Sequence, residues 1–264
     1  MKRILLCPPT NFDIEYEINP WMHVERKVDK AKAMAAYDDL KRIYESLGVQ
    51  VFEIPQEKDL PDMVYVTDTG HAVGDIFIAA NFRYPERRRE SAVVAKYLED
   101  KFGFTTAHIP DGIFFEGHGD LVVSDEVYFM GYGKRSMIEA LPYLQKYISQ
   151  PVIPIELVDP YYYHLDTCFA ILNPEVALIN PTSFTKKGLE QIHSHFKRVI
   201  EASPIDHQVL ACNLVTIDNH LITALGISDT LQTELEKLGF IVHLVDTVEY
   251  RKGGGSVRCM TFEF

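Results

Sequence analysis

Cysteine and tryptophan are scarce in this 264-residue chain, which contains four cysteines and one tryptophan. Cys7, Cys168, Cys212 and Cys259 lie far apart in the sequence, and none of them belongs to a C-x-x-C pair. This spacing argues against a disulfide framework and against a zinc knuckle. Because free thiols are typical of a reducing compartment, the sequence predicts a cytoplasmic protein.

Long hydrophobic runs are also missing. The N-terminal stretch MKRILLC is broken by Pro8 and Pro9, so it is too short for the hydrophobic region of a signal peptide and is interpreted as a first strand. No later apolar run approaches the length of a membrane span, and we expect no membrane partner.

Positive charge is in deficit, with 26 Lys and Arg residues against 38 Asp and Glu residues and a formal net charge of −12. An acidic protein repels phosphate backbones, so nucleic acid is not expected as a partner. The charge suits a small cationic ligand, although solubility alone also accounts for an acidic surface. A homo-oligomer is compatible with the sequence.

The apolar pattern predicts an α/β fold in which units of strand, helix and hairpin recur five times. Helices are expected at residues 29–47, 86–101, 136–147 with Ser136 as N-cap, 186–200 and 228–238. Strands are expected at 1–7, 49–54, 63–66, 71–80 with a turn or bulge at 74–75, 105–109, 120–123, 126–131, 152–158, 168–172, 176–179, 209–210, 214–217, 220–223, 241–244 and 259–263. No linker divides the chain, which predicts one catalytic domain over residues 1–264. A doubly wound sheet is the alternative, but the strands come as hairpins and no glycine-rich phosphate loop follows the first strand.

Cys259 is the candidate nucleophile. It follows the segment Gly253-Gly254-Gly255-Ser256-Val257-Arg258, and consecutive glycines permit unusual backbone angles and a close approach of backbone to ligand. A thiol that has lost its proton is a strong nucleophile. The alternative is a small buried hydrophobic residue, which is the favoured interpretation for the other three cysteines.

Three acidic segments accompany this thiol. In His164-Leu165-Asp166 an extended backbone places both titratable side chains on one face, where a histidine can transfer protons and a carboxylate can orient it or bind a cation. Glu116 follows two aromatic residues in the segment FFEGHGD, and Asp68 ends an apolar run in PDMVYVTDTG. Taken singly, these residues could be a structural pair, a hairpin turn and a turn aspartate. Neither His118 nor Asp120 has a third ligand at a metal-like spacing.

Together these residues suit a guanidinium substrate. A guanidinium is planar and cationic, and carboxylates bind its N–H groups in pairs. Attack at its central carbon requires a nucleophile, carboxylates on the N–H groups and an acid for the departing amine. Cys259, His164, Asp68, Glu116 and Asp166 supply these functions without a metal or an organic cofactor.

The sequence resembles the guanidino-modifying (pentein) enzymes, which comprise arginine deiminases, dimethylarginine dimethylaminohydrolases, amidinotransferases and arginine dihydrolases. The matching segments, in the order of the family, are PDMVYVTDTG, FFEGHGD, GYGKRS, YYYHLDTCF and GGGSVRCMT. The resemblance implies a five-bladed α/β propeller with pseudo-fivefold symmetry.

By position, the resemblance implies that Cys259 is the nucleophile and His164 the general acid and base, with Glu116 binding the guanidinium or orienting His164. Asp68 and Asp166 would bind the guanidinium, and Asp62, in the same segment as Asp68, is a further substrate-binding candidate. The resemblance also implies that Arg135 binds the substrate α-carboxylate. Arg87 is a second candidate for that role, with Arg83, Arg88 and Arg89 as alternatives.

Three departures from individual members of the family bear on the substrate. The arginine dihydrolases resemble this chain but carry Asn where it has Asp68, whereas the deiminases carry Asp. The chain is too short for the extra helical domain of the deiminases, and the dimethylarginine hydrolases lack the aspartate of the HLD segment. We therefore expect hydrolysis of arginine or a related guanidino compound to a ureido product such as citrulline. The alternatives are a dihydrolase that forms ornithine, an amidinotransferase and a non-catalytic arginine-binding protein.

Overall fold

Five separate three-stranded sheets make up the fold in the computed structural model, which describes residues 2–124 and 126–264. The strands of these sheets are β15 (Phe262–Glu263), β1 (Arg3–Leu6) and β2 (Gln50–Glu53); β3 (Gly70–Val73), β4 (Ile76–Ala79) and β5 (Thr105–His108); β6 (Leu121–Val123), β7 (Tyr128–Tyr132) and β8 (Val152–Glu156); β9 (Phe169–Asn173), β10 (Val176–Ile179) and β11 (Arg198–Glu201); and β12 (Val215–Ile217), β13 (His220–Ala224) and β14 (Ile241–Val245). Five separate sheets exclude the doubly wound alternative.

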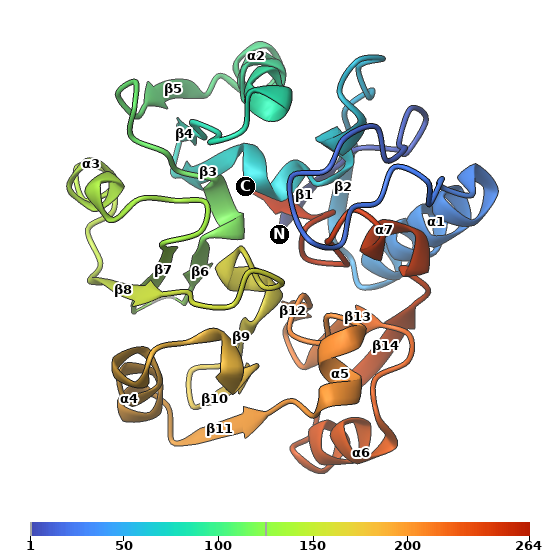
Figure 1. Ribbon diagram of the computed structural model, residues 1–264, viewed down its shortest axis with the longest axis vertical. Helices are drawn as coiled ribbons and strands as arrows, with labels where there is room; N and C mark the ends of the chain where they lie inside the picture. The colour runs from blue at the N-terminus through green and yellow to red at the C-terminus, as the bar shows by residue number, and fades with distance from the viewer. Residues whose placement is uncertain (1, 125) are drawn as a thin grey trace.

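Each sheet follows one plan, in which an antiparallel pair is joined by a helical crossover to a third, parallel strand. The helices are α1 (Lys30–Ser46), α2 (Arg88–Phe102), α3 (Leu141–Leu144), α4 (Lys186–His195), α5 (Pro204–Gln208), α6 (Asp229–Lys237) and α7 (Val248–Arg251). The crossover helices lie at the periphery and the sheets point towards the middle of the molecule (Figure 1). The predicted α/β class and the five repeated units are confirmed.

The crossover helix α1 illustrates why these segments are helical. Asp29 caps its N-terminus by accepting hydrogen bonds from the backbone N–H groups of Ala31 and Lys32, which otherwise have no partner within the helix. Its buried face places Leu40 and Tyr44 against the first sheet, and both side chains are fully buried. A fully buried residue of this kind contributes about 1.5–3 kcal/mol through the hydrophobic effect.

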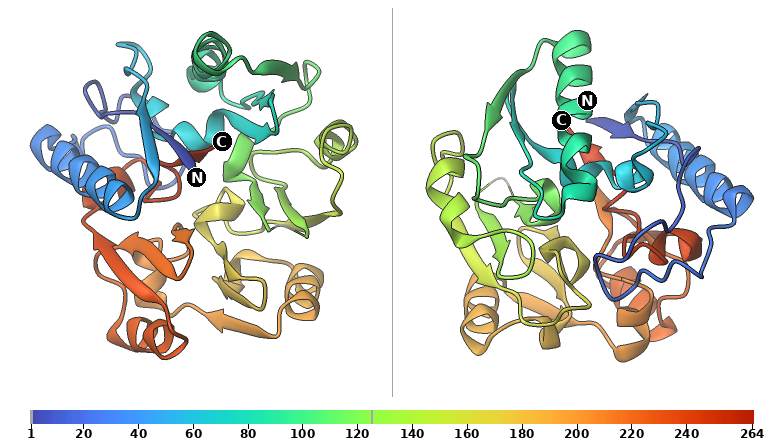
Figure 2. Two further views of the ribbon diagram at one scale, coloured as in Figure 1. Left: turned by 180° about the vertical axis from the view of Figure 1, so that it is seen from behind. Right: turned by 45° about the horizontal axis from the view of Figure 1, so that its top comes forward.

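The two ends of the chain share one sheet. β15 pairs antiparallel with β1, and the pairing joins Ile4 to Glu263 and Leu5 to Phe262. β1 and β15, near the two ends of the chain, therefore lie side by side near the middle of the molecule, as Figure 1 and the view from behind in Figure 2 show. The hydrophobic clusters lie between neighbouring units: one of them combines Ile78 of β4 with Met130 of β7.

The segment that precedes the first strand of each sheet also lies near the middle. Four of these segments contain short 3-10 turns or loops that carry polar residues: η2 (Val66–Thr69) before β3, η4 (Gly117–Gly119) before β6, η6 (Leu165–Thr167) before β9, and residues 256–261 before β15. η4 contacts both η2 and η6, so these turns bring together parts of the chain that are far apart in sequence.

Several predicted elements are wrong. Residues 63–66 are not a strand, because Pro61 begins a pair of 3-10 turns (η1, Pro61–Val64, and η2) in which the apolar side chains are all buried and do not alternate. The helix predicted at 186–200 ends at His195, since residues 198–201 form β11 and pair with β10. The strand predicted at 259–263 is reduced to Phe262–Glu263.

Three smaller differences concern the last units and α3. Ser136 is not an N-cap: its hydroxyl accepts from the N–H of Glu116, and the helical region begins later with η5 (Ile138–Ala140). Leu210 has a φ of 56° and is not part of a strand. The short helices α5 and α7 were not predicted. Met1 and Asp125, in a predicted strand and a predicted turn, lie outside the described residues.

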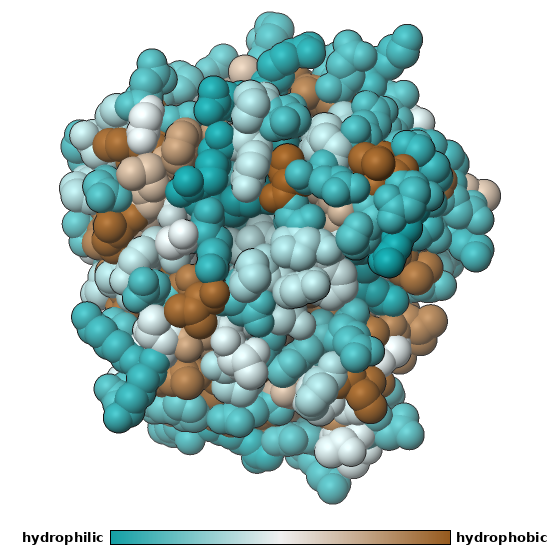
Figure 3. Space-filling model, viewed as in Figure 1, coloured by the Kyte–Doolittle hydropathy of each residue, from teal (hydrophilic) through white to brown (hydrophobic). Residues whose placement is uncertain are grey.

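The face seen in Figure 1 is mostly hydrophilic, with hydrophobic side chains exposed singly (Figure 3). Among the large hydrophobic residues of the described chain, the more exposed include Tyr161 at 52% and Ile205 at 60%. Across residues 2–124 and 126–264, none of the helices has the length and apolar character that crossing a membrane requires.

Candidate active site

Cys259, Asp68 and Asp166 meet at the middle of the molecule although they come from three different units. The thiol sulfur and one oxygen of each carboxylate lie within 4.8 Å of one another. Sγ of Cys259 is 3.5 Å from Oδ2 of Asp166. All three residues are at most 2% exposed. The segments that precede β3, β9 and β15 therefore assemble one compact thiol–carboxylate cluster.

Each carboxylate of the cluster has one oxygen with a partner and one without. Oδ2 of Asp68 accepts a hydrogen bond of 2.7 Å from Nη1 of Arg87, and Oδ2 of Asp166 faces the thiol. Among the described residues, Oδ1 of Asp68 and Oδ1 of Asp166 have no hydrogen-bond partner. A buried carboxylate oxygen without a donor is costly, so both atoms are available to a ligand that carries N–H groups.

His164 lies next to the cluster and is fully buried. Its Nε2 is 2.7 Å from Oε2 of Glu116, while its Nδ1 is 3.6 Å from Oδ1 of Asp68 and has no hydrogen-bond partner within the described chain. Burial alone would lower the pKa of His164, but the carboxylates of Asp68, Asp120 and Glu116 raise this pKa to about 9. The imidazole is therefore held in its protonated form at neutral pH, with Nδ1–H directed towards the cluster.

Glu116 links His164 to Arg135. Oε2 of Glu116 also accepts a hydrogen bond of 2.9 Å from Nη1 of Arg135. Burial acts to raise the pKa of Glu116, but Arg135 and His164 outweigh it and hold this pKa below its ordinary value. Glu116 is therefore an ionised carboxylate that fixes the imidazole ring through Nε2 of His164.

Arg135 is 3% exposed and lies between two aromatic rings, with its guanidinium carbon 4.6 Å from the ring centre of Tyr84 and 4.5 Å from that of Tyr163. It also donates to the backbone carbonyl of Ile18. Ile18 belongs to the segment between β1 and α1, which crosses the face shown in Figure 1. The predicted contact of Arg135 with an α-carboxylate stays a prediction.

Arg87 is the buried member of the arginine-rich segment 83–89. It makes hydrogen bonds to Asp68 and to Glu90, and Nη2 of Arg87 is 2.8 Å from Oε2 of Glu90. The competing Arg88 and Arg89 are exposed, so Arg87 is the arginine of this segment that reaches the cluster. Sequence reasoning missed Glu90; its spacing from Arg87, three residues along a helical stretch, is a signal that could have found it.

Asp62 is buried at the edge of the site, and its Oδ1 has no hydrogen-bond partner among residues 2–124 and 126–264. Burial raises the pKa of Asp62 to about 6, although Arg87 acts to lower it. The carbonyl of Asp62 lies 3.4 Å from Nη2 of Arg87. Asp62 therefore adds a further acceptor beside the arginine-rich side of the cluster.

The thiol of Cys259 is in a negative environment. Burial, Asp166 and Asp68 raise its pKa well above the ordinary value, while hydrogen bonds from the Ser256 backbone and from Asn213 oppose this shift. Burial and Asp68 also raise the pKa of Asp166, to about 8. A cation placed between these groups would favour the thiolate and the carboxylate, so the site is electrostatically suited to a cationic ligand.

The triple glycine before Cys259 is required by packing. A Cβ on Gly253 would lie 2.2 Å from the hydroxyl of Tyr65, and a Cβ on Gly255 would lie 2.5 Å from the same ring. Gly254 has a φ of +90° and approaches Tyr163. The close approach predicted from these glycines is therefore an approach to two tyrosine rings, which fix the backbone that carries the thiol.

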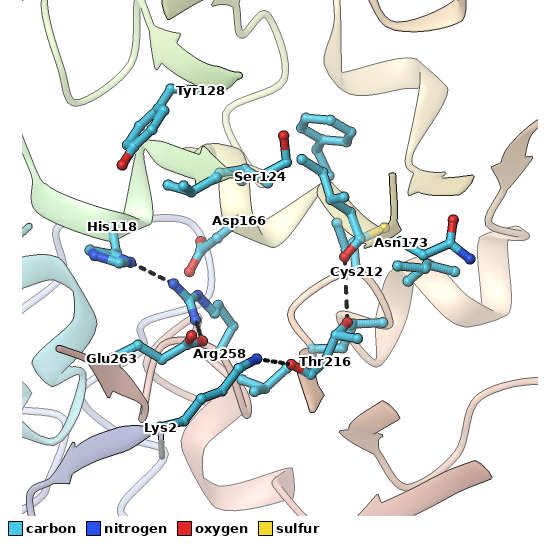
Figure 4. Close-up of a pocket in the computed structure, with 18 of the residues that line it drawn as sticks. Lys2, His118, Ser124, Tyr128, Asp166, Asn173, Cys212, Thr216, Arg258 and Glu263 are labelled. Atoms are coloured by element: carbon cyan, nitrogen blue, oxygen red, sulfur yellow. Dashed lines mark hydrogen bonds and ion pairs between the residues drawn. The ribbon is translucent and has the colours of Figure 1, made fainter. Parts of the chain in front are cut away.

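A cavity of about 630 Å³ reaches the cluster from the side of the chain termini and is lined by residues such as Lys2, Asp166 and Glu263 (Figure 4). Within it, Nη2 of Arg258 contacts His118, whose other ring nitrogen contacts His71. The ring of His118 therefore contacts Arg258 and His71 and not Asp120. Asp120 accepts hydrogen bonds from the backbone N–H groups of Ser136 and Leu165. Asp166 is the member of the cluster that lines this cavity.

The cluster of one thiol and two carboxylates could also hold a metal ion by geometry. Arg87 already supplies a cation to Asp68 at 2.7 Å. The two remaining carboxylate oxygens could accept hydrogen bonds from the N–H groups of a planar cation. Nδ1 of His164 would then face the same cation. The absence of a metal requirement stays a prediction.

A buried cysteine, a histidine held by a glutamate and two carboxylates, carried on five α/β units, place the chain among the guanidino-modifying enzymes, and the predicted superfamily is confirmed. The model of the family described as "N,N dimethylarginine dimethylhydrolase, eukaryotic" matches residues 9–264. The chain belongs to this family.

Individual relatives differ in the activity for which they are named. The N(G),N(G)-dimethylarginine dimethylaminohydrolase of Mycobacterium tuberculosis is 35% identical over 268 residues, which cover 99% of this chain and 85% of the relative. The bifunctional arginine dihydrolase/ornithine cyclodeaminase ArgZ of Synechocystis is 32% identical over 266 residues, 98% of this chain but only 37% of the relative. A crystal structure of the N-terminal domain of ArgZ, covalently bound to a reaction intermediate, has a TM-score of 0.95 and 30% identity and covers 100% of this chain and 97% of that domain.

Proposed function

We propose that this protein is a cysteine-dependent hydrolase of arginine, which releases ammonia and a ureido product such as citrulline without a metal or an organic cofactor. The observation that carries the proposal is the pair of unpartnered oxygens, Oδ1 of Asp68 and Oδ1 of Asp166, in a cluster with Sγ of Cys259. A guanidinium placed there would donate one N–H to each carboxylate.

The charge balance of the buried groups supports a cationic substrate. Buried carboxyl groups outnumber the buried cations, which are Arg87, Arg135 and the protonated imidazole of His164. The buried carboxyl groups around the cluster are Asp62, Asp68, Glu90, Glu116, Asp120 and Asp166. Burial raises the pKa values of Glu90 and Asp166 to about 8, so these two groups hold their protons at pH 7 without a ligand. A guanidinium would favour the ionised form of Asp166 and offset its charge, whereas an anionic or neutral substrate would not.

The same two oxygens favour an unmethylated guanidinium. Arginine has N–H groups on both terminal nitrogens and can satisfy Asp68 and Asp166 together. A dimethylated nitrogen has no N–H and would leave one buried acceptor unpaired, at a cost of about 1–3 kcal/mol. We therefore favour arginine over dimethylarginine, although the family model takes its name from dimethylarginine hydrolysis.

In the first half of the reaction, the thiolate of Cys259 attacks the guanidinium carbon and a C–S bond forms. The C–N bond to one terminal nitrogen then breaks, and Nδ1–H of His164 protonates the departing ammonia. His164 suits this role because its pKa, raised to about 9 by the surrounding carboxylates, keeps it protonated at neutral pH. The covalent ArgZ structure supports an intermediate of this kind in a protein of the same fold.

In the second half, His164 is neutral and accepts a proton from water. The water oxygen attacks the carbon of the covalent intermediate, the C–O bond forms and the C–S bond breaks, which restores the thiolate. Glu116 holds Nε2 of His164 throughout, so Nδ1 transfers the proton in both directions.

The amino-acid end of the substrate would be bound at the arginine-rich side of the cluster. Asp62 has an unpartnered buried oxygen that would accept from an α-ammonium group. Arg135 has five N–H donors, and those not directed at Glu116 and Ile18 would bind the α-carboxylate. The contacts of Arg87 with Asp68 and Glu90 favour a role in orienting Asp68 over direct binding.

An arginine dihydrolase that forms ornithine is the second candidate, favoured by the similarity to ArgZ. Incubation with arginine and with dimethylarginine, followed by identification of the amino acids formed, separates the candidates. Citrulline from arginine supports the proposal, ornithine identifies a dihydrolase, and turnover of dimethylarginine alone identifies a methylarginine hydrolase. Turnover only with an amine acceptor would identify an amidinotransferase, and arginine binding without any turnover a binding protein.

The covalent step is tested separately on acid-quenched protein. Mass spectrometry should show an arginine-derived adduct on Cys259, and Cys259→Ser should abolish turnover. A fully active Cys259→Ser variant would contradict the mechanism. Dialysis against a chelator should leave activity unchanged.

We further propose that the five units close into a five-bladed propeller that forms one catalytic domain. The pairing of β15 with β1 supports this proposal, because it places strands from both ends of the chain in a single unit.

A further inference from the structure

The side chain of Asn213 contacts the sulfur of Cys259. Nδ2 of Asn213 lies 3.1 Å from Sγ and 3.3 Å from the backbone carbonyl oxygen of Asp166. Asn213 is 0% exposed. It precedes β12, so it occupies in the fifth unit the place that Asp68, Asp166 and Cys259 occupy before the first strands of their own sheets.

The orientation of this amide is determined by its neighbours. Oδ1 of Asn213 accepts from the backbone N–H groups of Ser256 at 2.9 Å and of Cys259 at 3.1 Å. These groups can only donate, so the oxygen must face them. The NH₂ group must therefore face Sγ of Cys259 and the carbonyl of Asp166, both of which can accept.

The surroundings of the thiol give this N–H donor its importance. Oδ2 of Asp166 lies 3.5 Å from Sγ, and an oxygen of Asp68 belongs to the same cluster, so both carboxylates disfavour negative charge on sulfur. The N–H of Asn213 opposes them, since it lowers the pKa of the thiol. A donor to a charged acceptor is worth more than one to a neutral acceptor.

We propose that Asn213 is a catalytic residue whose Nδ2–H stabilises the Cys259 thiolate, both as it attacks and as it departs during hydrolysis. The expected effect of Asn213 on kcat rests on the proposed function as a cysteine hydrolase. The contact with the reacting sulfur can be tested without substrate. Asn213 also holds the backbone of residues 256–259 through Oδ1, and a test must separate this second role from the first.

Asn213→Asp makes that separation, because it keeps an oxygen for the two backbone N–H groups and replaces the NH₂ with a second oxygen. The rate of Cys259 alkylation by iodoacetamide is measured against pH in Asn213→Asp, Asn213→Ala and the wild type. In both variants the inflection should move to higher pH, by one unit or more for Asn213→Asp. For arginine hydrolysis, kcat should fall by roughly 10- to 100-fold with KM changed less than about threefold.

Asn180→Asp is the matched control, since Asn180 is a 1% exposed asparagine whose Oδ1 accepts from Thr182 and caps η7 (Pro181–Ser183). Its alkylation profile should equal that of the wild type. Identical profiles for wild type and a folded Asn213→Asp would overturn the proposal. If both Asn213 variants fail to fold, the proposal is tested by NMR on the wild type. The side-chain ¹⁵N–¹H₂ signals of Asn213 should shift as Cys259 titrates, and this shift should be lost in Cys259→Ser. Signals that do not titrate in the wild type would also overturn it.

A failure of arginine hydrolysis in the wild type would count against the proposed function alone. The alkylation profiles and the amide signals would still report on the contact between Asn213 and Cys259. The two proposals therefore fail independently.

Discussion

Nε2 of His164 lies 2.7 Å from Oε2 of Glu116, so the imidazole is anchored by one nitrogen and presents the other to the thiol–carboxylate cluster. The same glutamate oxygen also accepts from Arg135. Glu116 thus determines both the orientation of His164 and part of the negative charge that keeps it protonated.

Glu116→Gln should move the alkaline limb of the pH profile. The pKa of His164 is raised to about 9, so the imidazole holds its second proton below that pH and loses it above. Removing the carboxylate, with Arg135 left unpaired nearby, lowers this pKa and shifts the alkaline limb of kcat, which reports on the substrate complex with its thiolate, to lower pH by about one unit or more. We also expect kcat to fall by at least about 100-fold.

The measurement is kcat for arginine, at saturating substrate, from pH 5.5 to pH 10. Glu99→Gln, at an exposed position of α2, is the control and should reproduce the wild-type profile. An unchanged alkaline limb in Glu116→Gln would show that the limb does not report on His164.

Binding of arginine should release protons. In the free protein, burial and neighbouring carboxylates raise the pKa of Cys259 well above its ordinary value and that of Asp166 to about 8. Both groups hold protons at pH 7. A bound guanidinium favours their charged forms, so protons leave as the complex forms. Calorimetry at pH 7 in buffers with different ionisation enthalpies measures the number released.

The proton release should fall in Asp166→Asn, which lacks one of the two groups, and to a smaller extent in Cys259→Ser. Proton uptake, or a binding enthalpy that is the same in every buffer, would contradict the assignment of protonated groups. Because citrulline is neutral, it should release fewer protons than arginine.

Gly119 leaves the space in which Asp68 and His164 face each other. A Cβ at this position would lie 2.5 Å from Oδ1 of Asp68 and 2.8 Å from Nδ1 of His164, the unpartnered atoms at the centre of the proposed mechanism. Gly119→Ala should therefore reduce kcat/KM by about 100-fold or more, because small displacements of reacting groups are costly. Steady-state kinetics with arginine measure the loss.

Gly188→Ala is the matched control, since its Cβ would meet its nearest neighbour, a methyl carbon of Ile155, at 3.4 Å. Gly188 lies in α4, where alanine is preferred over glycine. This variant should keep full activity and melt at the same or a higher temperature. Equal activities of Gly119→Ala and the wild type would place the reacting atoms elsewhere.

The residues that sequence reasoning identified stand in short polar segments after apolar runs. Cys259 follows three glycines, and His164 and Asp166 form a pair with extended spacing; such local patterns are visible without a structure. Asn213 has no such pattern, because its neighbours Cys212 and Leu214 are buried apolar residues. Its position is recognisable only once the strand boundaries show that it precedes β12.

Glu90 was missed for a different reason. In the segment PERRRE it resembles a solvent-exposed charged residue of a helix, and the turn from η3 (Pro85–Arg87) into α2 is what directs both Arg87 and Glu90 inward. The same limit applies to residues 63–66, where a run of apolar residues predicted a strand. Tertiary burial of all the side chains of η1 and η2 overrides the local preference.

Asp68 should decide how far hydrolysis proceeds. After loss of one ammonia, the ureido product is neutral, and its carbonyl oxygen would occupy a position where an N–H group had been. If that position faces Oδ1 of Asp68, two acceptors meet, because an ionised carboxylate cannot donate. Arg87, 2.7 Å from the other oxygen, holds Asp68 in place. The contact should weaken binding of the ureido product by about 1–3 kcal/mol, so the product leaves before a second attack.

Asp68→Asn should relieve this conflict, because its NH₂ group can donate to the carbonyl oxygen and retain the product. The variant should be slower with arginine, since it has lost a charged acceptor, and part of its product should be ornithine and a second ammonia. Amino-acid analysis with isotopically labelled arginine measures the ratio of citrulline to ornithine in each protein. Asp229→Asn, in the first turn of α6, is the control and should give citrulline alone. Ornithine as the main wild-type product would overturn the argument, and an Asp68→Asn variant with wild-type rate and products would show that Asp68 does not contact the substrate.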